Sequence, residues 1–294
     1  MAVVVVSWNI DKRHEPWRQL LEMDADVALL QEAGQPPPDV ADRIDTGPRE
    51  HWDSHVWNSR WYGDRWPHLH ERWSMVVKLS DRVDVEWFKQ VSPICDTAEA
   101  EDEMAVSGIG TIAAALIKPK DAPPFIAVSM YARWTRPHPH ANSRWFIGYA
   151  DGSAHRIISD LSAFIGDTDP GTHRILAAGD LNMAFGVDDD NPQALTARER
   201  TVMDRMDALG MEYLGPRYPA GRRASPTPRG LAPDTPNVPT YHTRTRNPET
   251  AEHQLDHAFA SRGFHDSVKV RALNSVEEWG ASDHCRLRIE VAGE

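Results

Sequence analysis

Short apolar runs that stop abruptly at polar residues constrain this chain more than any other feature of its sequence. The first run, residues 2–6, leads directly into Ser7-Trp8-Asn9. Runs of this kind, rich in β-branched residues and ended by polar ones, predict strands buried on both faces. The same reasoning predicts further strands at 27–30, 75–79, 83–88, 111–117, 125–130, 175–178, 254–260, 268–273 and 285–291.

Three other stretches have the apolar spacing of helices. They span 16–23, 153–164 and 196–209. Pro16 stands at the first turn of the first helix, and Thr196 and Glu199 have the spacing of a capping box at the start of the third. No change in composition divides the chain. We therefore expect one α/β domain over residues 1–294, although length alone suggests about two domains.

The composition excludes several classes of protein. Hydrophobic residues make up 40% of the chain and there are 11 Trp, which is enough for a packed core and argues against wholesale disorder. No window approaches the ~18 consecutive apolar residues of a membrane span, and the run 2–6 is too short for a signal peptide. With only two cysteines, Cys95 and Cys285, a disulfide-stapled secreted protein is excluded. We expect a cytoplasmic protein without a membrane span.

Charge bears on the partner. The net charge of −12 argues against a general basic surface that coats nucleic acid. Arginine is nevertheless concentrated locally, with six Arg against one acid in 213–246 and three Arg without an acid in 131–146. Arginine favours bidentate contacts to phosphate or carboxylate, although an Arg-rich genome gives the same bias. The Pro/Arg loop, residues 216–239, is longer than most connections, which indicates a functional or a disordered segment.

Polar residues with catalytic chemistry lie at the ends of six predicted strands. They are Asn9 and Asp11, Glu32, Tyr131, Asp180 and Asn182, Asp256, and Asp283 with His284. Because strand ends are fixed points of a fold, residues far apart in sequence can converge there. A set of carboxylates and amides with one His and one Tyr suits Mg²⁺ or Mn²⁺ rather than zinc. A hard cation beside an Asp–His pair is suited to hydrolysis of a phosphate ester, because the metal neutralises charge and the pair handles protons.

Five motifs in order along the chain resemble those of the endonuclease/exonuclease/phosphatase superfamily, which includes exonuclease III and DNase I. They are Trp8-Asn9-Ile10-Asp11, Leu30-Gln31-Glu32, Gly179-Asp180-Leu181-Asn182, Gln254-Leu255-Asp256-His257 and Ser282-Asp283-His284. The resemblance runs from the first strand to the last. It implies a four-layered α/β sandwich, in which two packed mixed β-sheets are flanked by helices. The fourth motif departs from the Arg-Ile-Asp-Tyr common in the family: the Asp is kept and its neighbours are altered.

The resemblance implies a metal site. Glu32 stands at the family's principal metal-ligand position. Asn9, Asp11 and Asp283 are expected to support the shell of the Mg²⁺ or Mn²⁺ ion, and a solvated loop carboxylate is the alternative for Asp11.

The resemblance also implies catalytic roles. Asp180 aligns or deprotonates the attacking water, and Asn182 positions the water and the phosphate. His284, oriented by Asp256, stabilises the charge on a phosphoryl oxygen, and Tyr131 supports the phosphate. The alternatives are a simple turn at Asp180 and a structural core histidine at His284.

Three readings of the function follow. The first is a nuclease that hydrolyses nucleic acid, DNA in particular, with Arg133, Arg222 and Arg223 binding the substrate. The second keeps the chemistry but takes a small phosphoester, such as a nucleotide, an inositol phosphate or a lipid headgroup, which the −12 charge favours. The third is a degenerate member that only binds a partner. The sequence carries no signal for an oligomeric state.

Two further segments invite sharper readings. Residues 51–73 hold five Trp and four His, which suits either a platform for stacking bases or a loop packed by its own aromatics, and we favour the loop. His138-Pro139-His140 is interpreted as a loop rather than a zinc site, because no Cys lies nearby. Cys285 is expected to face the core as a small hydrophobe.

Overall fold

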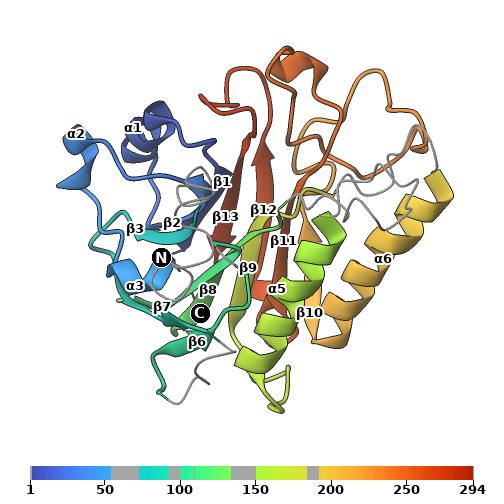
Figure 1. The fold of residues 1–294 in the computed structure, drawn as a ribbon. Helices are drawn as coiled ribbons and strands as arrows, with labels where there is room; N and C mark the ends of the chain where they lie inside the picture. Colours follow the sequence, from blue (N-terminus) through green and yellow to red (C-terminus); the bar gives the residue numbers. More distant parts are fainter. Residues whose placement is uncertain are drawn as a thin grey trace, which may run out of the picture.

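Two β-sheets packed face to face form the centre of the structure, a computed structural model that describes residues 2–53, 73–92, 100–108, 110–133, 150–183 and 192–293 (Figure 1). The first sheet has the order β12 (Val268–Leu273), β13 (Arg286–Val291), β1 (Val3–Asn9), β2 (Val27–Ala33) and β3 (Trp73–Lys78). The second has the order β10 (Met211–Gly215), β11 (Asp256–Ser261), β9 (Ile175–Asp180), β8 (Phe125–Tyr131), β7 (Ile112–Pro119) and β4 (Val83–Trp87). Both sheets are mixed, because β1 and β2 pair in parallel, as do β8 and β9, within otherwise antiparallel sheets.

Helices cover the outer face of each sheet and complete four layers. The first sheet carries α1 (His14–Glu22) with the short helix α2 (Pro38–Ala41) against it, and the short helix α3 (Arg49–Trp52) lies beside β3. The second carries α5 (Ala150–Ile165) and α6 (Pro192–Ala208), which lie side by side in Figure 1. Smaller elements are β5 (Lys89–Val91), β6 (Glu103–Ala105), η2 (Pro248–Thr250) and η3 (His265–Ser267). The predicted four-layered α/β sandwich is confirmed.

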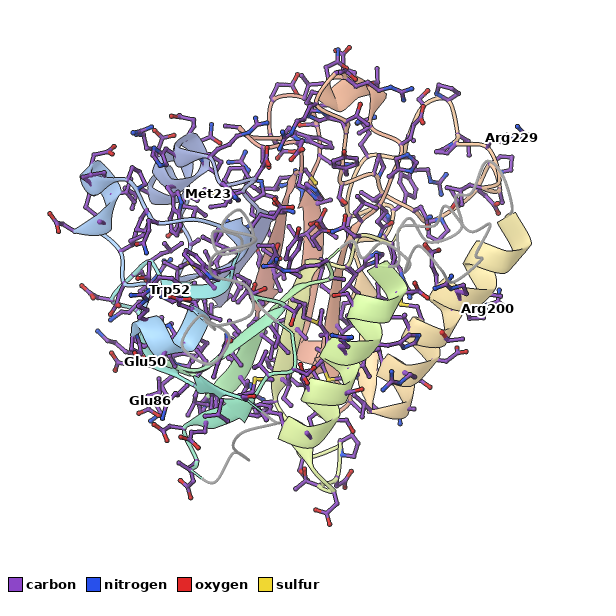
Figure 2. All side chains as sticks on the ribbon, in the orientation of Figure 1. Met23, Glu50, Trp52, Glu86, Arg200 and Arg229 are labelled. Atoms are coloured by element: carbon purple, nitrogen blue, oxygen red, sulfur yellow. The ribbon has the colours of Figure 1, made fainter. Side chains whose placement is uncertain are left out.

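The alternation of side chains along β1 explains why its sequence is apolar throughout. Val3 and Val5 point into the core between the two sheets, and Val4 and Val6 point into the core under α1. A strand covered on both faces needs apolar residues at every position, so the period of two is hidden in the sequence. Side chains fill the space between the sheets and between sheet and helix (Figure 2).

The predicted strands and the three long helices are present, with boundaries that differ by a few residues. The helix predicted at 196–209 begins earlier, at Pro192, so Thr196 lies inside the helix and the predicted capping box is wrong. β10 was not predicted, because Met211–Gly215 is short, ends in glycine and lies at a sheet edge. The short helices and the β5–β6 pair also give no periodic signal in the sequence.

Some sequence predictions concern single segments. Trp73 begins β3 and packs against Trp52 with ring centroids 4.6 Å apart, as expected of a self-packed aromatic segment. Residues 54–72, His138, His140 and Cys95 lie outside the described residues. Cys285 is buried in the core between the sheets, as predicted. None of the described helices is long and apolar enough to cross a membrane.

Candidate active site

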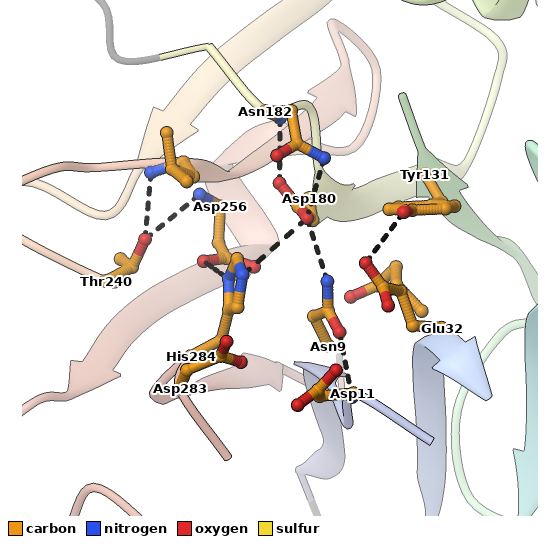
Figure 3. A network of polar contacts seen from close by, with 12 residues as sticks. Asn9, Asp11, Glu32, Tyr131, Asp180, Asn182, Thr240, Asp256, Asp283 and His284 are labelled. Atoms are coloured by element: carbon orange, nitrogen blue, oxygen red, sulfur yellow. Dashed lines mark hydrogen bonds and ion pairs between the residues drawn. The ribbon is translucent and has the colours of Figure 1, made fainter. Parts of the chain in front are cut away.

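The site lies where the apolar face between the two sheets becomes polar. Along β9, Leu176 and Ala178 face the inter-sheet core, and Asp180 is the next residue on that face. Along β11, Asp256 precedes Ala258 on the same face. Asn9 of β1 and Tyr131 of β8 likewise continue the inward faces of their strands (Figure 3). The period of two along each strand thus directs residues from both sheets into one space.

A close approach of two strands sets the position of Asp180. β8 and β9 pair in parallel, with Met130 opposite Gly179 and Tyr131 opposite Asp180. A Cβ atom on Gly179 would lie 1.9 Å from the carbonyl oxygen of Met130. Only glycine fits beside that backbone, so Gly179 allows the strands to meet directly behind the Asp180 carboxylate.

Three hydrogen bonds hold the Asp180 carboxylate, which is fully buried. The Nδ2 of Asn9 donates to its Oδ2 at 2.9 Å across the two sheets. The backbone N–H of Asn182 donates to Oδ1 at 2.7 Å, and the Asn182 Nδ2 donates to Oδ2 at 3.0 Å. Burial raises the pKa of Asp180, opposed by His284 and reinforced by Asp256. The turn reading of Asp180 and Asn182 is correct for the backbone but leaves out a carboxylate that faces four other polar groups.

Asp256 and His284 form a buried pair. The Nδ1 of His284 lies 2.8 Å from Oδ2 of Asp256, and its Nε2 lies 3.8 Å from Oδ2 of Asp180. Burial alone would lower the pKa of His284, but Asp256 and Asp180 outweigh it and raise the pKa to about 10. The raised pKa favours the protonated form of the imidazole, whose Nε2 faces Asp180.

Backbone contacts fix both members of this pair. Trp8 Nε1 donates to the carbonyl of His284 at 2.9 Å. Thr240 Oγ1 accepts hydrogen bonds from the N–H groups of Leu255 and Asp256, at 2.9 and 3.0 Å. Thr240 was not predicted as a site residue, because it stands at the end of the Pro/Arg loop, outside any periodic segment.

Glu32 reaches the same space from β2. The pairing of β2 with β3 is irregular between Leu30 and Ala33, and Glu32 has φ +45°. A bulge turns a side chain away from the face that alternation would give it. Tyr131 of the opposite sheet donates its hydroxyl to Glu32 Oε1 at 2.7 Å. Burial, followed by the charge of Glu32, raises the pKa of Tyr131 well above its ordinary value, so this tyrosine is a neutral hydrogen-bond donor.

Backbone strain is concentrated at the site. The described residues other than glycine with positive φ are Asp11, Lys12, Glu32 and Asn182. Such conformations cost of order 1–3 kcal/mol each and persist where the surrounding structure enforces them, often at functional sites. Three of these residues were selected from sequence as metal or catalytic residues.

Asp11 and Asp283 lie on the open side of the site, joined by an arginine. Arg244 NH2 bonds Asp11 Oδ1 at 2.5 Å, and its Nε lies 3.9 Å from Asp283 Oδ2. The Arg244 side chain is 64% exposed, and the two carboxylates are almost covered. Arg244 was not predicted as a site residue. Its place in the basic segment 213–246 was the only sequence signal.

The predicted substrate-binding arginines differ in their surroundings. The Arg133 guanidinium lies 5.7 Å from the ring centroid of Tyr131, at the site. Arg222 is half-buried and donates to the backbone carbonyls of Asn274, Arg223 and Pro248. Arg223 stacks on the ring of Tyr218 at 3.8 Å and contacts the carbonyl of Asp234. The guanidinium groups of Arg222 and Arg223 thus have partners within and beside the Pro/Arg loop, and their predicted role in substrate binding stays a prediction.

The donor set fits a hard divalent cation. Among the described residues, the His, Cys, Asp and Glu side chains whose ligand atoms converge most closely are Asp180, Asp256 and His284, within 4.8 Å of one another. Glu32 and Asp283 are also buried, so the region holds several carboxylates around the imidazole of His284. Buried carboxylates are costly unless they are paired or bind a metal. The predicted ligands Asn9, Glu32, Asp11 and Asp283 surround this cluster rather than form it (Figure 3).

Comparison with known proteins identifies the fold. No protein-family model and no curated protein sequence matches the chain. The catalytic domain of APE2 from Xenopus laevis superposes with a TM-score of 0.60 at 14% identity, over 99% of this chain and 94% of that one. AP endonuclease LMAP from Leishmania major gives 0.58 at 14% identity, over 100% and 88%. The 3′ phosphatase NExo from Neisseria, bound to a product DNA hairpin, gives 0.54 at 15% identity, over 99% of each chain.

These similarities extend over essentially the whole chain. The protein shares the DNase I-like α/β-sandwich fold of these structures, which is the fold that the resemblance in its motifs implies. Identities of 14–15% establish the fold alone, so activity must be argued from the site.

Proposed function

We propose that the protein is a divalent-metal-dependent phosphodiesterase that hydrolyses the backbone of DNA. The observation that carries the proposal is the buried Asp180–His284–Asp256 arrangement, in which an imidazole lies between two carboxylates. A structural histidine in the core needs only a partner for its Nδ1–H. The Nε2 of His284 also faces a polar space that is lined by residues of both sheets.

The described side chains supply two of the functions that phosphodiester hydrolysis needs. Asp180 aligns the attacking water and accepts its proton, and a raised pKa makes this carboxylate a better base. Asn9 and Asn182 hold the carboxylate at both oxygens, so its orientation is set before the substrate arrives. His284 donates its Nε2–H to a phosphoryl oxygen as negative charge builds there, and Asp256 fixes the ring.

Glu32, Asn9, Asp11 and Asp283 are the residues that we propose to hold Mg²⁺ or Mn²⁺ next to this group. A bound cation of this kind supplies Lewis-acid neutralisation of phosphoryl charge. Tyr131 keeps Glu32 in place through its hydroxyl and, as a neutral phenol, remains a donor that can approach a phosphate.

DNA is the substrate that the fold neighbours favour, since one is named an AP endonuclease and another was solved with a product DNA hairpin. Arg133 and Arg244 are the described arginines best placed to meet the phosphates, because one lies on Tyr131 and the other spans Asp11 and Asp283. A small phosphoester is the second candidate. The net charge of −12 and the internal use of Arg222 and Arg223 favour it.

An activity panel separates these readings. Plasmid, single-stranded DNA, RNA, a duplex with one abasic site and bis(p-nitrophenyl) phosphate would each be incubated with Mg²⁺ or Mn²⁺. We expect cleavage of a DNA substrate by the natural chain and none by the His284→Ala chain. Cleavage of the small diester alone would select the second candidate. A folded protein that cleaves no substrate with either metal would contradict the proposal and leave a protein that only binds a partner.

A further inference from the structure

The motif that departs from the family pattern builds a second polar network, on the other face of β11. Asp256 points between the sheets, so the next residue, His257, points toward the helix layer, as Phe259 does. His257 is buried. Among the described carboxylates, only that of the neighbouring Asp256 shifts its pKa. The ring therefore lies outside the site described above.

The contacts of His257 fix its tautomer. Its Nε2 lies 3.1 Å from the carbonyl oxygen of Met183, which can only accept, so Nε2 carries the proton. Its Nδ1 is then an acceptor and faces the hydroxyl of Tyr213 at 3.4 Å. Burial lowers the pKa of His257, in agreement with a neutral ring.

Gln254 continues the network in the same direction. Its Nε2 donates to the hydroxyl of Tyr213 at 2.8 Å and to the carbonyl of Pro216 at 2.9 Å. Its Oε1 accepts from the N–H of Val238 at 2.9 Å. Hydrogen bonds thus connect Gln254 to Tyr213 and Tyr213 to His257. Gln254 also binds both ends of the Pro/Arg loop, at Pro216 and Val238.

The network ends on the turn that carries Asn182. Leu181 N–H donates to the carbonyl of Leu255 at 3.0 Å, and Met183 is held from the other side by His257. Asn182, between these two anchors, has φ +50°, a conformation that a non-glycine residue keeps only when its surroundings enforce it. Both anchors come from the motif Gln254-Leu255-Asp256-His257.

We propose that His257 is a positioning residue, which holds Asn182 against Asp180 through the carbonyl of Met183, with Gln254 and Tyr213 fixing its tautomer. The expected effect of His257 on catalysis rests on the proposed phosphodiesterase function. Its expected effect on the position of Asn182 does not. The same motif therefore orients the site from both faces of β11: Asp256 acts on His284, and His257 acts on Asn182.

The test compares His257→Phe, which removes the donor, with His257→Gln, whose amide can restore it. Phe264→Leu is the matched control, because Phe264 is equally buried and follows the far end of β11. Hydrogen exchange at the amides of Leu181 and Asn182 reports the turn directly, without any substrate. We expect these two amides to exchange faster in His257→Phe than in the unsubstituted protein. The exchange rate should be partly restored in His257→Gln and unchanged in Phe264→Leu.

With a substrate in hand, kcat of His257→Phe should fall by about tenfold to a hundredfold with KM nearly unchanged, the scale on which misplaced catalytic groups lose rate. The proposal would be overturned if His257→Phe folds and its amides at Leu181 and Asn182 exchange as slowly as in the unsubstituted protein. An equal acceleration of exchange in Phe264→Leu would also overturn it. If His257→Phe does not fold, Tyr213→Phe replaces it: faster exchange at the turn supports the proposal and natural exchange refutes it. A natural chain without activity, but with the expected exchange pattern, would reject the function and keep the positioning role.

Discussion

The Asp256–His284 pair differs from the arginines of the Pro/Arg loop in the partners of its hydrogen bonds. The Nδ1 of His284 lies 2.8 Å from Asp256, and its Nε2 faces Asp180 at 3.8 Å, beyond hydrogen-bond distance. The Arg222 guanidinium is occupied by three backbone carbonyls, and Arg229 lies at the outer edge of the molecule (Figure 2). A basic side chain is available to a ligand only when the surrounding loop leaves its donors open.

Burial accounts for much of this difference. A buried pair on two strands has few conformations, so its remaining donor has a fixed direction and gains strength from the low dielectric of its surroundings. An arginine in a loop without regular structure can meet the unpaired carbonyls that such a loop contains. Arg222 does this for the carbonyls of Asn274 and Pro248, and these bonds join the Pro/Arg loop to residues outside it.

The largest expected effect comes from removing the pair. His284→Ala and Asp256→Ala should each lower kcat by about a hundredfold or more, the range that a positioned acid–base group contributes. The double variant should lose little more than the worse single one, because Asp256 acts through His284. Steady-state rates of the three variants, with a thermal melt of each preparation, check this. Fully additive losses, or a natural rate in folded His284→Ala protein, would place the pair outside the mechanism.

The next effect concerns the metal. Glu32→Gln keeps an oxygen for the Tyr131 hydroxyl but removes the charge that we assign to metal binding. The metal concentration for half-maximal activity should rise by about tenfold to a hundredfold. Tyr131→Phe is the control that removes the hydrogen bond and keeps the charge, and its shift should be smaller. A metal titration of activity measures both, and equal titration curves for Glu32→Gln and the natural chain would remove Glu32 from the metal site.

Substitutions at Arg222 and Arg244 test the difference between an arginine bonded to loop carbonyls and an arginine at the site. Arg222→Ala should lower the stability by about 1–3 kcal/mol, the scale of hydrogen bonds to a charged group, and leave the salt dependence of DNA affinity unchanged. Arg244→Ala should reduce the slope of log K against log salt by about one, as expected when one phosphate contact is lost. Chemical unfolding and DNA binding at several salt concentrations measure these. The opposite pattern would mean that Arg222 binds substrate after all.

The last effect concerns pH and a histidine far from the chemistry. His51 is fully buried, accepts a hydrogen bond from Val76 N–H at 3.1 Å and faces the Phe88 carbonyl with its other nitrogen, so the ring is neutral. Burial lowers the pKa of His51 from 6.5 to about 3. A folded-state pKa below the unfolded one gives stability that is present above pH 6.5 and is lost as the pH falls toward 3.

This loss should amount to about 1.4 kcal/mol per pH unit below 6.5, because one proton is taken up on unfolding. His51→Gln should show a shallower decline over this range, measured as the difference between the two proteins in chemical unfolding at pH 7, 6, 5 and 4. Parallel curves would show that His51 is not the group responsible.

The apolar runs predicted the strands and placed most candidate site residues at their ends, and the resemblance of the five motifs predicted the four layers. Asn9, Asp180 and Asp256 continue the inward faces of their strands. Because the runs are apolar throughout, their convergence was predicted from strand ends and motifs and not from alternation. Glu32 was selected only through its motif, since a bulge and not the alternation directs it inward. Thr240 and Arg244 were missed because loops place them. The carbonyl partners of Arg222 at Asn274 and Pro248 could not be predicted, because they are distant in sequence.

The most direct test of the central claim is the rate of DNA cleavage by the natural chain before and after removal of divalent metal. The account predicts cleavage with Mg²⁺ or Mn²⁺, loss of cleavage in excess chelator, and recovery when either metal is added back. The His284→Ala chain, folded by thermal melt, should remain inactive throughout. Undiminished cleavage in excess chelator, or cleavage by the His284→Ala chain at the natural rate, would contradict a metal-dependent site built on Asp180, Asp256 and His284.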